Sequence, residues 1–160
     1  MTTRTPTQRR LDTLETLRRG RDAWVASANG DGTAHLIGLA FSWDGERLTV
    51  ATRERSKTGR NLARARWARV ALDLHKDVVI VEGPLEVIPI DADDALADAH
   101  AAAIGFDFRT LPESYVFFRL TPSRIQAMRS PEEEPDRAIM RDGRWLDDRI
   151  TAEPHTSRVA

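Results

Sequence analysis

Four basic side chains gather in a short stretch of the chain, residues 52–62, which reads TRERSKTGRNL. Arg53, Arg55, Lys57 and Arg60 are accompanied there by a single acid, Glu54. A guanidinium presents a fork of N–H donors that matches phosphate oxygens, and a lysine adds a compact positive charge. The composition of this stretch therefore indicates chemistry directed at an anion.

The same stretch is predicted to join the end of a strand to the start of a helix. Ser56 is a good N-cap residue, and together with Thr58 it adds hydroxyl donors. A helix N-terminus leaves backbone N–H groups without partners and carries the positive end of the helix dipole. We therefore predict a site for one phosphate-sized anion; the alternative is a solvated charged loop with an ordinary serine cap.

Hydrophobic spacing and turn residues predict the elements that position this site. Leu11, Leu14 and Leu17 recur every third residue before Gly20, which predicts a helix over residues 7–19. After Trp24 the pattern changes to alternation, which is typical of strands. Further helices are predicted over residues 56–66 and 91–104, strands over 24–28, 33–43, 47–53, 69–74, 77–88, 115–120 and 123–128, and a terminal hairpin over 138–146.

The order of these elements predicts a mainly β fold. Short connections favour antiparallel pairing, with the first three strands forming a meander, and seven strands with three helices favour a closed barrel with flanking helices. Gly83 and Pro84, inside the strand predicted over residues 77–88, indicate a bend at a barrel corner. A nucleotide fold of the Rossmann or P-loop type is excluded, because its glycine-rich motifs do not occur.

Composition narrows the class of protein further. The chain has 160 residues, 41% hydrophobic and 31% charged, which suits one domain with a packed core. Its net charge of −1 gives nucleic-acid binding no support, and the absence of cysteine excludes disulfides and thiolate chemistry. No apolar run approaches the roughly 20 residues of a membrane span, and no signal peptide is recognised. These features predict a soluble cytoplasmic protein without a membrane or nucleic-acid partner.

Both ends of the chain are predicted to be peripheral. Residues 1–6 have the composition of a loose tail, and the last dozen residues are polar. Residues 130–136, which read SPEEEPD, are predicted to form a loop or linker in which Glu132, Glu133 and Glu134 are solvated.

The histidines give no clear catalytic or metal centre. His35, near the start of a strand, could either pack beside aromatic residues or line a substrate pocket. His100, Asp98 and Asp94 do not share one face of a helix, so we predict no metal site. No catalytic residue is assigned, because no serine, histidine and aspartate occur in a recognisable motif.

Several further segments occur in a characteristic order. They are residues 23–27 (AWVAS) with the turn at 29–32 (NGDG), 35–39 (HLIGL), 43–45 (WDG), 48–52 (LTVAT), 56–62 (SKTGRNL), 69–72 (RVAL) and 77–83 (DVVIVEG). In this order and spacing the chain, over roughly residues 10–130, resembles the pyridoxamine 5′-phosphate oxidase-like split-barrel flavoproteins. Some small members of that family bind the deazaflavin F420 rather than FMN.

The resemblance implies a homodimer of FMN-binding split β-barrels with the cofactors at the interface. It implies that Ile37, Gly38 and Leu39 lie beside the flavin ring, largely through their backbone, where a small Gly38 suits the approach of a flat ring. It also implies that Thr52 contacts the cofactor and that the phosphate is held by the basic turn, which here contains Arg53, Arg55, Ser56, Lys57 and Thr58. A substrate entering from the exposed face of the ring would pass near His35.

The chain departs from authentic pyridoxamine phosphate oxidases at three places. Lys57 and Thr58 stand where those enzymes commonly have consecutive Arg and Lys, and Val78 replaces a flavin-contacting Gln. Their C-terminal Arg-x-His substrate motif has no counterpart in residues 137–160. The resemblance therefore implies a scaffold and a phosphate turn but no substrate. On this basis residues 1–130 are predicted to be the flavin-binding domain, and residues 131–160 an acidic linker, a small hairpin and a tail.

The leading prediction is an FMN-binding oxidoreductase of an unknown small molecule, with a second copy of the chain as its partner. Trp24, Trp43 and Trp67 are assigned to the core or to the dimer interface. Three alternatives stay open: an F420-dependent reductase of the same fold, a non-catalytic flavin or haem-type carrier or sensor, and a barrel that acts as an interaction module with an empty pocket.

Overall fold

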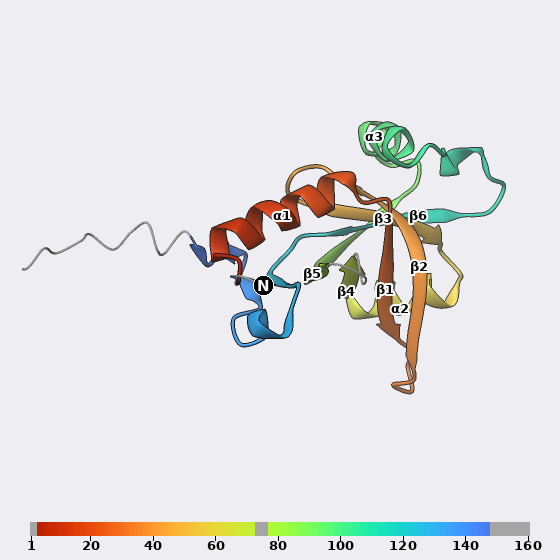
Figure 1. Ribbon diagram of the computed structural model, residues 1–160. Coiled ribbons are helices and arrows are strands. Elements are labelled where there is room, and N and C mark those ends of the chain that lie inside the picture. Colours follow the sequence, from red (N-terminus) through yellow and green to blue (C-terminus); the bar gives the residue numbers. More distant parts are fainter. Residues whose placement is uncertain (1–2, 73–76, 148–160) are drawn as a thin grey trace, which may run out of the picture.

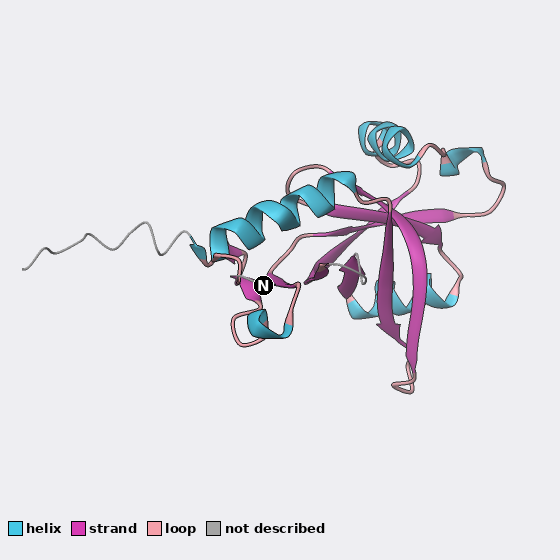
Figure 2. Cartoon of the chain, viewed as in Figure 1, coloured by secondary structure: helices cyan, strands magenta, loops and turns pink. Residues whose placement is uncertain are grey.

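The computed structural model describes residues 3–72 and 77–147 (Figures 1 and 2). Its helices are α1 (Pro6–Arg19), α2 (Lys57–Ala65) and α3 (Asp94–Ile104), with short 3-10 turns η1 (Phe108–Thr110) and η2 (Pro131–Glu133). Its strands are β1 (Asp22–Ala28), β2 (Ala34–Trp43), β3 (Leu48–Arg53), β4 (Trp67–Leu72), β5 (Val78–Pro89), β6 (Tyr115–Leu120), β7 (Arg124–Met128), β8 (Ala138–Arg141) and β9 (Arg144–Trp145). The predicted helices and strands are confirmed in kind, and most boundaries differ by one or two residues.

The larger boundary differences have local causes. The predicted helix over residues 91–104 begins only at Asp94, because the Asp93 side chain accepts a hydrogen bond from the Leu96 N–H and caps the helix there. β4 begins at Trp67, and the end of the strand predicted over residues 69–74 lies partly outside the described residues.

Six antiparallel strands close into a barrel. The order of pairing is β1-β2-β3-β6-β5-β4, and β4 pairs again with β1. The hairpin of β8 and β9 continues the sheet from β7, which pairs with β5. The predicted mainly β barrel with flanking helices is therefore confirmed, including the meander of β1, β2 and β3.

β5 turns the corner of the barrel at Gly83 and Pro84. Before the corner its residues pair with β4, as in Val81 with Val70, and after it they pair with β6, as in Leu85 with Leu120. A Cβ atom added at Gly83 would lie 1.9 Å from the carbonyl oxygen of Thr121. Only glycine permits the two backbones to approach this closely, so the predicted bend is confirmed with its steric reason.

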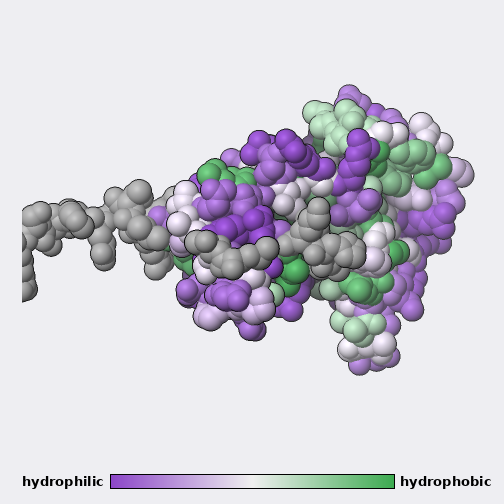
Figure 3. All heavy atoms as spheres, in the orientation of Figure 1, coloured by the Kyte–Doolittle hydropathy of each residue, from purple (hydrophilic) through white to green (hydrophobic). Residues whose placement is uncertain are grey.

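Apolar side chains from the six barrel strands form the main core together with residues of α1, α2 and β7. The largest of the fully buried ones are Phe41, Phe118, Leu17, Leu48, Leu62, Leu120 and Ile125. A smaller cluster of Ala51, Ile88, Ala97 and Phe117 lies where α3 packs against the strands. Trp43 packs against the core, as one of its two predicted roles requires. On the face shown in Figure 3, hydrophilic residues predominate and hydrophobic ones reach the surface in small groups.

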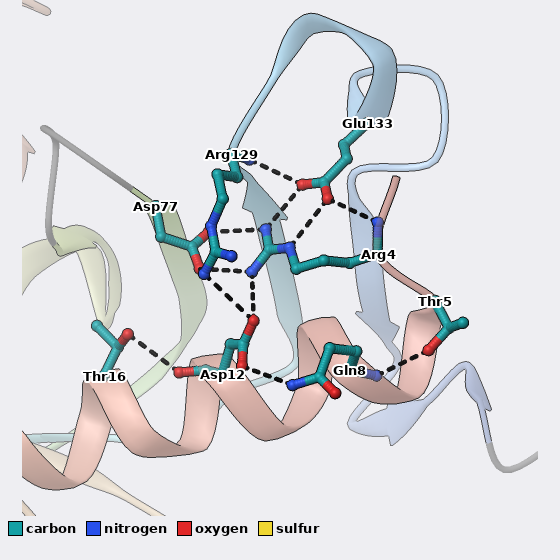
Figure 4. A network of polar contacts seen from close by, with 8 residues as sticks. All are labelled: Arg4, Thr5, Gln8, Asp12, Thr16, Asp77, Arg129 and Glu133. Carbon is teal, nitrogen blue, oxygen red and sulfur yellow. Dashed lines mark hydrogen bonds and ion pairs between the residues drawn. The ribbon is translucent and has the colours of Figure 1, made fainter. Parts of the chain in front are cut away.

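The N-terminal segment is anchored rather than loose. The side chain of Arg4 is only 7% exposed and forms ion pairs with Asp12 on α1, Asp77 before β5, and Glu133 in η2 (Figure 4). Arg129 binds the same Asp12 and Asp77. The prediction of a tail over residues 1–6 is therefore wrong for Arg4, because its guanidinium has three carboxylates to bind.

Glu133 is also not solvated as predicted. Its carboxylate accepts hydrogen bonds from the side chain and the backbone N–H of Arg4 and from the backbone N–H of Arg129. The Arg4 guanidinium is the main reason that the pKa of Glu133 is lowered to about 2. Thr5 caps α1 beside this network by accepting a hydrogen bond from the Gln8 N–H.

No helix within residues 3–72 and 77–147 combines the length and apolar character needed to cross a membrane.

Replacement of Gly83 by alanine is expected to destabilise the barrel corner. The added methyl group overlaps the Thr121 carbonyl, so the free energy of unfolding should fall by at least about 2 kcal/mol in urea titrations. Gly30→Ala is the matched control, because its Cβ atom would meet nothing closer than the Arg64 guanidinium at 3.8 Å. Equal stability of the two variants would contradict the steric account.

Glu133→Gln is expected to lower the free energy of unfolding at pH 7 by about 3 kcal/mol, because a buried carboxylate loses its charge beside Arg4. Since the pKa of Glu133 falls from 4.5 to about 2 on folding, its stabilising contribution is complete above pH 4.5 and disappears as the pH falls towards 2. The gap between wild type and variant should therefore close over that range. The exposed Glu134→Gln is the control, and a pH-independent gap would refute the role of the charge.

Candidate functional site

The predicted anion site lies where β3 ends and α2 begins. Ser56 is the N-cap of α2, as predicted: its Oγ accepts a hydrogen bond of 3.0 Å from the Gly59 N–H and donates one of 2.8 Å to the Arg53 carbonyl. A Cβ atom on Gly59 would lie 2.4 Å from the Arg53 carbonyl oxygen. The first turn of α2 is thus held closely against the turn that precedes it.

Two backbone N–H groups at the start of α2 have no acceptor among the described residues. Gly59 and Arg60 donate to Ser56, whereas the N–H groups of Lys57 and Thr58 donate to no acceptor in the described part of the chain. Such groups form the positive end of a helix and are suited to binding an anion.

A row of hydroxyl groups borders this helix start. The Oγ1 of Thr52, at the end of β3, lies 3.3 Å from the Ser56 Oγ. The Oγ1 of Thr58 lies 3.0 Å from the Nε2 of His35 on β2. The structure therefore brings four of the predicted site residues together: Thr52, Ser56, Thr58 and His35. Thr52 and Thr58 are both buried.

The cations of the stretch do not all remain available. Arg53 donates to the Tyr115 hydroxyl, which together with Glu113 raises its pKa, and it forms an ion pair of 3.3 Å with Glu113. Arg55 and Lys57 are exposed and form no ion pair with a described residue, and Arg60 donates to the Arg55 carbonyl. Lys57 and Arg55 are thus the cations that best fit an anion at the helix start.

The three predicted ring-contacting residues of β2 do not lie on the same face of the strand. Ile37 and Leu39 point inward and pack against the core, whereas Gly38 is exposed and lies opposite Trp24 in the register. A Cβ atom on Gly38 would lie 3.9 Å from the Trp24 ring. Contact with a bound ring at Ile37 and Leu39 would therefore involve their backbone.

Asn61 is a site-supporting residue that the sequence reasoning missed. Its buried amide donates to Ser27 at 3.2 Å and to the Asn29 side chain at 3.0 Å, which fastens α2 to the end of β1. The signal was a polar residue on the same helix face as Thr58 and Leu62, where an apolar one is expected.

His100 is buried away from this site and serves packing. Its Nδ1 forms a hydrogen bond of 2.7 Å with Ser42 on β2, while its buried Nε2 has no partner in the part of the chain that the structure describes. Phe117 contacts the ring edge to face. Burial lowers the pKa of His100 to about 4. Within the described residues, no cluster of three histidine or acidic side chains is arranged to hold a metal ion.

A cavity of about 480 Å³ lies elsewhere, beside Arg4, Arg9 and η2. Its lining mixes arginines with Glu132, Glu133 and Asp136, so it offers no single sign of charge to a ligand.

The similarity to known proteins extends over most of the chain. Residues 13–129 match the family model described as pyridoxamine 5′-phosphate oxidase. Among solved structures, a putative pyridoxamine 5′-phosphate oxidase from Listeria innocua has 18% sequence identity and a TM-score of 0.62, with 74% of this chain and 97% of that chain covered. A search of curated proteins finds no match.

Two further solved structures are similar. A pyridoxamine 5′-phosphate oxidase-related, FMN-binding protein from Nostoc punctiforme has 12% identity and a TM-score of 0.54, covering 86% of this chain and 90% of that chain. A structure titled F420 reductase has 19% identity and a TM-score of 0.56, covering 69% and 93%. At these sequence identities the similarity supports the fold of this chain, and it does not identify a ligand.

His100→Asn should remove a pH dependence of stability while keeping a hydrogen bond to Ser42. In the wild type the pKa falls from 6.5 to about 4 on folding, so the unfolded chain binds more protons between these values and stability decreases as the pH falls. The free-energy difference between wild type and variant should change by about 3 kcal/mol between pH 7 and pH 4, as measured by urea unfolding. Parallel pH profiles would show that His100 does not titrate this way.

Proposed function

The chain belongs to the pyridoxamine 5′-phosphate oxidase family, and on that premise we propose that it is an FMN-binding oxidoreductase acting on a small molecule. One observation carries the proposal: α2 begins with two backbone N–H groups, on Lys57 and Thr58, that have no partner among residues 3–72 and 77–147, beside exposed cations. The family resemblance assigns the cofactor phosphate to this same turn.

The donor set fits a phosphate monoester. The amides of Lys57 and Thr58 supply directed N–H donors at the positive end of α2, and the Lys57 and Arg55 side chains supply charge. Because Ser56 already caps the helix, its role is to hold the turn in shape rather than to give its only proton to the ligand. Arg53 is engaged with Glu113 and Tyr115, so its charge is compensated and it is not assigned a direct contact with the phosphate.

The ring is proposed to lie along β2 and the end of β3. Because the side chains of Ile37 and Leu39 pack against the core, the ring would contact the backbone of β2 in this segment. Thr52 lies next to the phosphate turn, 3.3 Å from the Ser56 Oγ, and is proposed to contact the cofactor. These residues bind and orient the cofactor and exclude water from one of its sides.

A second copy of the chain is proposed to cover the outer face of the strands beside this site. Trp24, Leu36 and Trp67 on neighbouring strands are 47%, 60% and 46% exposed, which is unusual for large apolar side chains. The register places Trp24 and Leu36 on the same face of β1 and β2. A homodimer would bury them and close the cofactor site, in agreement with the second predicted role for Trp24 and Trp67.

A bound flavin supplies the hydride or electron transfer itself. The described residues therefore need not include a general acid or base, and none is assigned. The residues hold the phosphate, position the ring and shape the space in which a small substrate meets it. The substrate, the cytoplasmic location and the division of the chain at residue 130 remain predictions.

F420 is the second candidate cofactor, favoured by one observation: Arg55 and Arg60 are exposed near the start of α2 in addition to Lys57, which gives a longer anionic tail further cations to bind. The visible spectrum and mass of the small molecule that copurifies with the protein distinguish FMN from F420. Reduction by NADPH or reduced F420, followed by oxidation of trial acceptors, separates an enzyme from a carrier or sensor.

Lys57→Ala is expected to weaken FMN binding about tenfold in a fluorescence titration, because one charged contact to the phosphate is lost. Riboflavin, which lacks the phosphate, should bind wild type and variant alike. Arg18→Ala, on an exposed part of α1, is the control for the loss of a positive charge. If FMN does not saturate the wild type and Lys57→Ala behaves alike, the barrel is an interaction module with an empty pocket. Saturable binding of equal affinity in both proteins would instead show that Lys57 does not hold the phosphate.

A further inference from the structure

The contact between His35 and Thr58 joins β2 to the proposed phosphate site. His35 is half-buried on β2, and its Nε2 lies 3.0 Å from the Oγ1 of Thr58. Thr58 is the second residue of α2 and is only 1% exposed. Its hydroxyl group is therefore largely shielded from bulk water, and its hydrogen bonds must be found within the protein or with a ligand.

The Thr58 hydroxyl has one proton to donate, and in the described part of the chain its side chain has one partner, His35. If the imidazole accepts that proton, the hydroxyl presents only lone pairs to its remaining surroundings. If instead the imidazole donates from Nε2, the hydroxyl keeps its proton for another acceptor. The tautomer of His35 thus decides whether Thr58 attracts or repels an anion at the helix start.

The helix does not depend on His35 for its attachment to the barrel. Asn61 binds Ser27 and Asn29, and Arg64 donates to the carbonyl of Ala28 at 2.8 Å. Leu62 is fully buried in the core. These contacts hold α2 against β1 independently, so the attachment of the helix does not require the His35–Thr58 hydrogen bond.

We propose that His35 is a positioning residue of the phosphate site: it donates from Nε2 to the Thr58 Oγ1 and so directs the Thr58 hydroxyl proton to the cofactor phosphate. The inference rests on the proposed function, because it requires a phosphorylated ligand at the start of α2. It assigns His35 to the phosphate end of the cofactor and not to acid–base chemistry on the substrate. A negative phosphate favours this donor chain, since each hydrogen bond in it polarises the next.

The inference predicts a loss of affinity that depends on the phosphate. His35→Phe and Thr58→Val should each weaken FMN binding about tenfold while changing riboflavin binding by less than about twofold. The double variant should be no weaker than either single one, because both remove the same donor chain. His35→Gln, whose amide nitrogen can replace Nε2, should restore FMN binding to within about threefold of wild type.

Thr13→Val is the matched control. Thr13 is also fully buried, but it lies on α1 and its hydroxyl has no partner among the described residues, so FMN and riboflavin affinities should both stay at the wild-type level. In the wild-type protein with FMN bound, the ¹⁵N shifts of the His35 ring should report a protonated Nε2. This measurement needs no variant and remains decisive if His35→Phe does not fold.

Three results would overturn the inference: a ring protonated at Nδ1 only, equal losses of FMN and riboflavin affinity, or full FMN affinity in both single variants. Each requires that the wild type binds FMN. A wild type that binds no FMN would instead overturn the proposed function, and this inference with it.

Discussion

The barrel exists because β5 hydrogen-bonds to strands in both halves of the sheet. Its first part pairs with β4 and its last part with β6, and the change of partner occurs at Gly83, against the Thr121 carbonyl. Without a residue that lets two backbones approach there, β5 could not bend, and β4 could not return to β1. This single steric requirement therefore determines the closed interior that buries Phe41, Phe118 and Leu120.

The proposed phosphate site follows from this closure. β3 and β1 are held next to β2 in the barrel, and α2 connects β3 to β4 across that surface. The helix must therefore begin where β3 ends, which places its positive N-terminus beside β2 and within reach of His35. An anion bound there would lie close to the strand whose backbone is proposed to receive the flavin ring.

Much of this architecture could be predicted because its signals are local. Thr5, Ser56 and the glycines at turns such as Gly45 act on residues a few positions away, so their spacing indicates where elements begin and end. The barrel and the basic turn were predictable for the same reason. The Arg4 network was not, because Arg4 and Glu133 are 129 residues apart in the sequence.

The site was predicted as a set of residues but not as a geometry. Nothing in the spacing of the basic turn indicates that Arg53 is engaged by Glu113, or that Thr58 is buried against His35. Both contacts depend on how β3 pairs with β6 and how α2 packs against β1 and β3, which only the closed barrel determines. The proposed functions of the basic turn accordingly rest on the described contacts together with the family.

The central claim is that the start of α2 binds the phosphate of a flavin. A titration of ¹⁵N-labelled protein with FMN, followed by amide ¹H–¹⁵N spectra, tests it directly. The account predicts that the largest shifts occur at the backbone amides of Lys57 and Thr58, and that riboflavin leaves these two signals nearly unchanged. Shifts confined to the cavity beside Arg4 and Arg9, or equal shifts with both ligands, would contradict it.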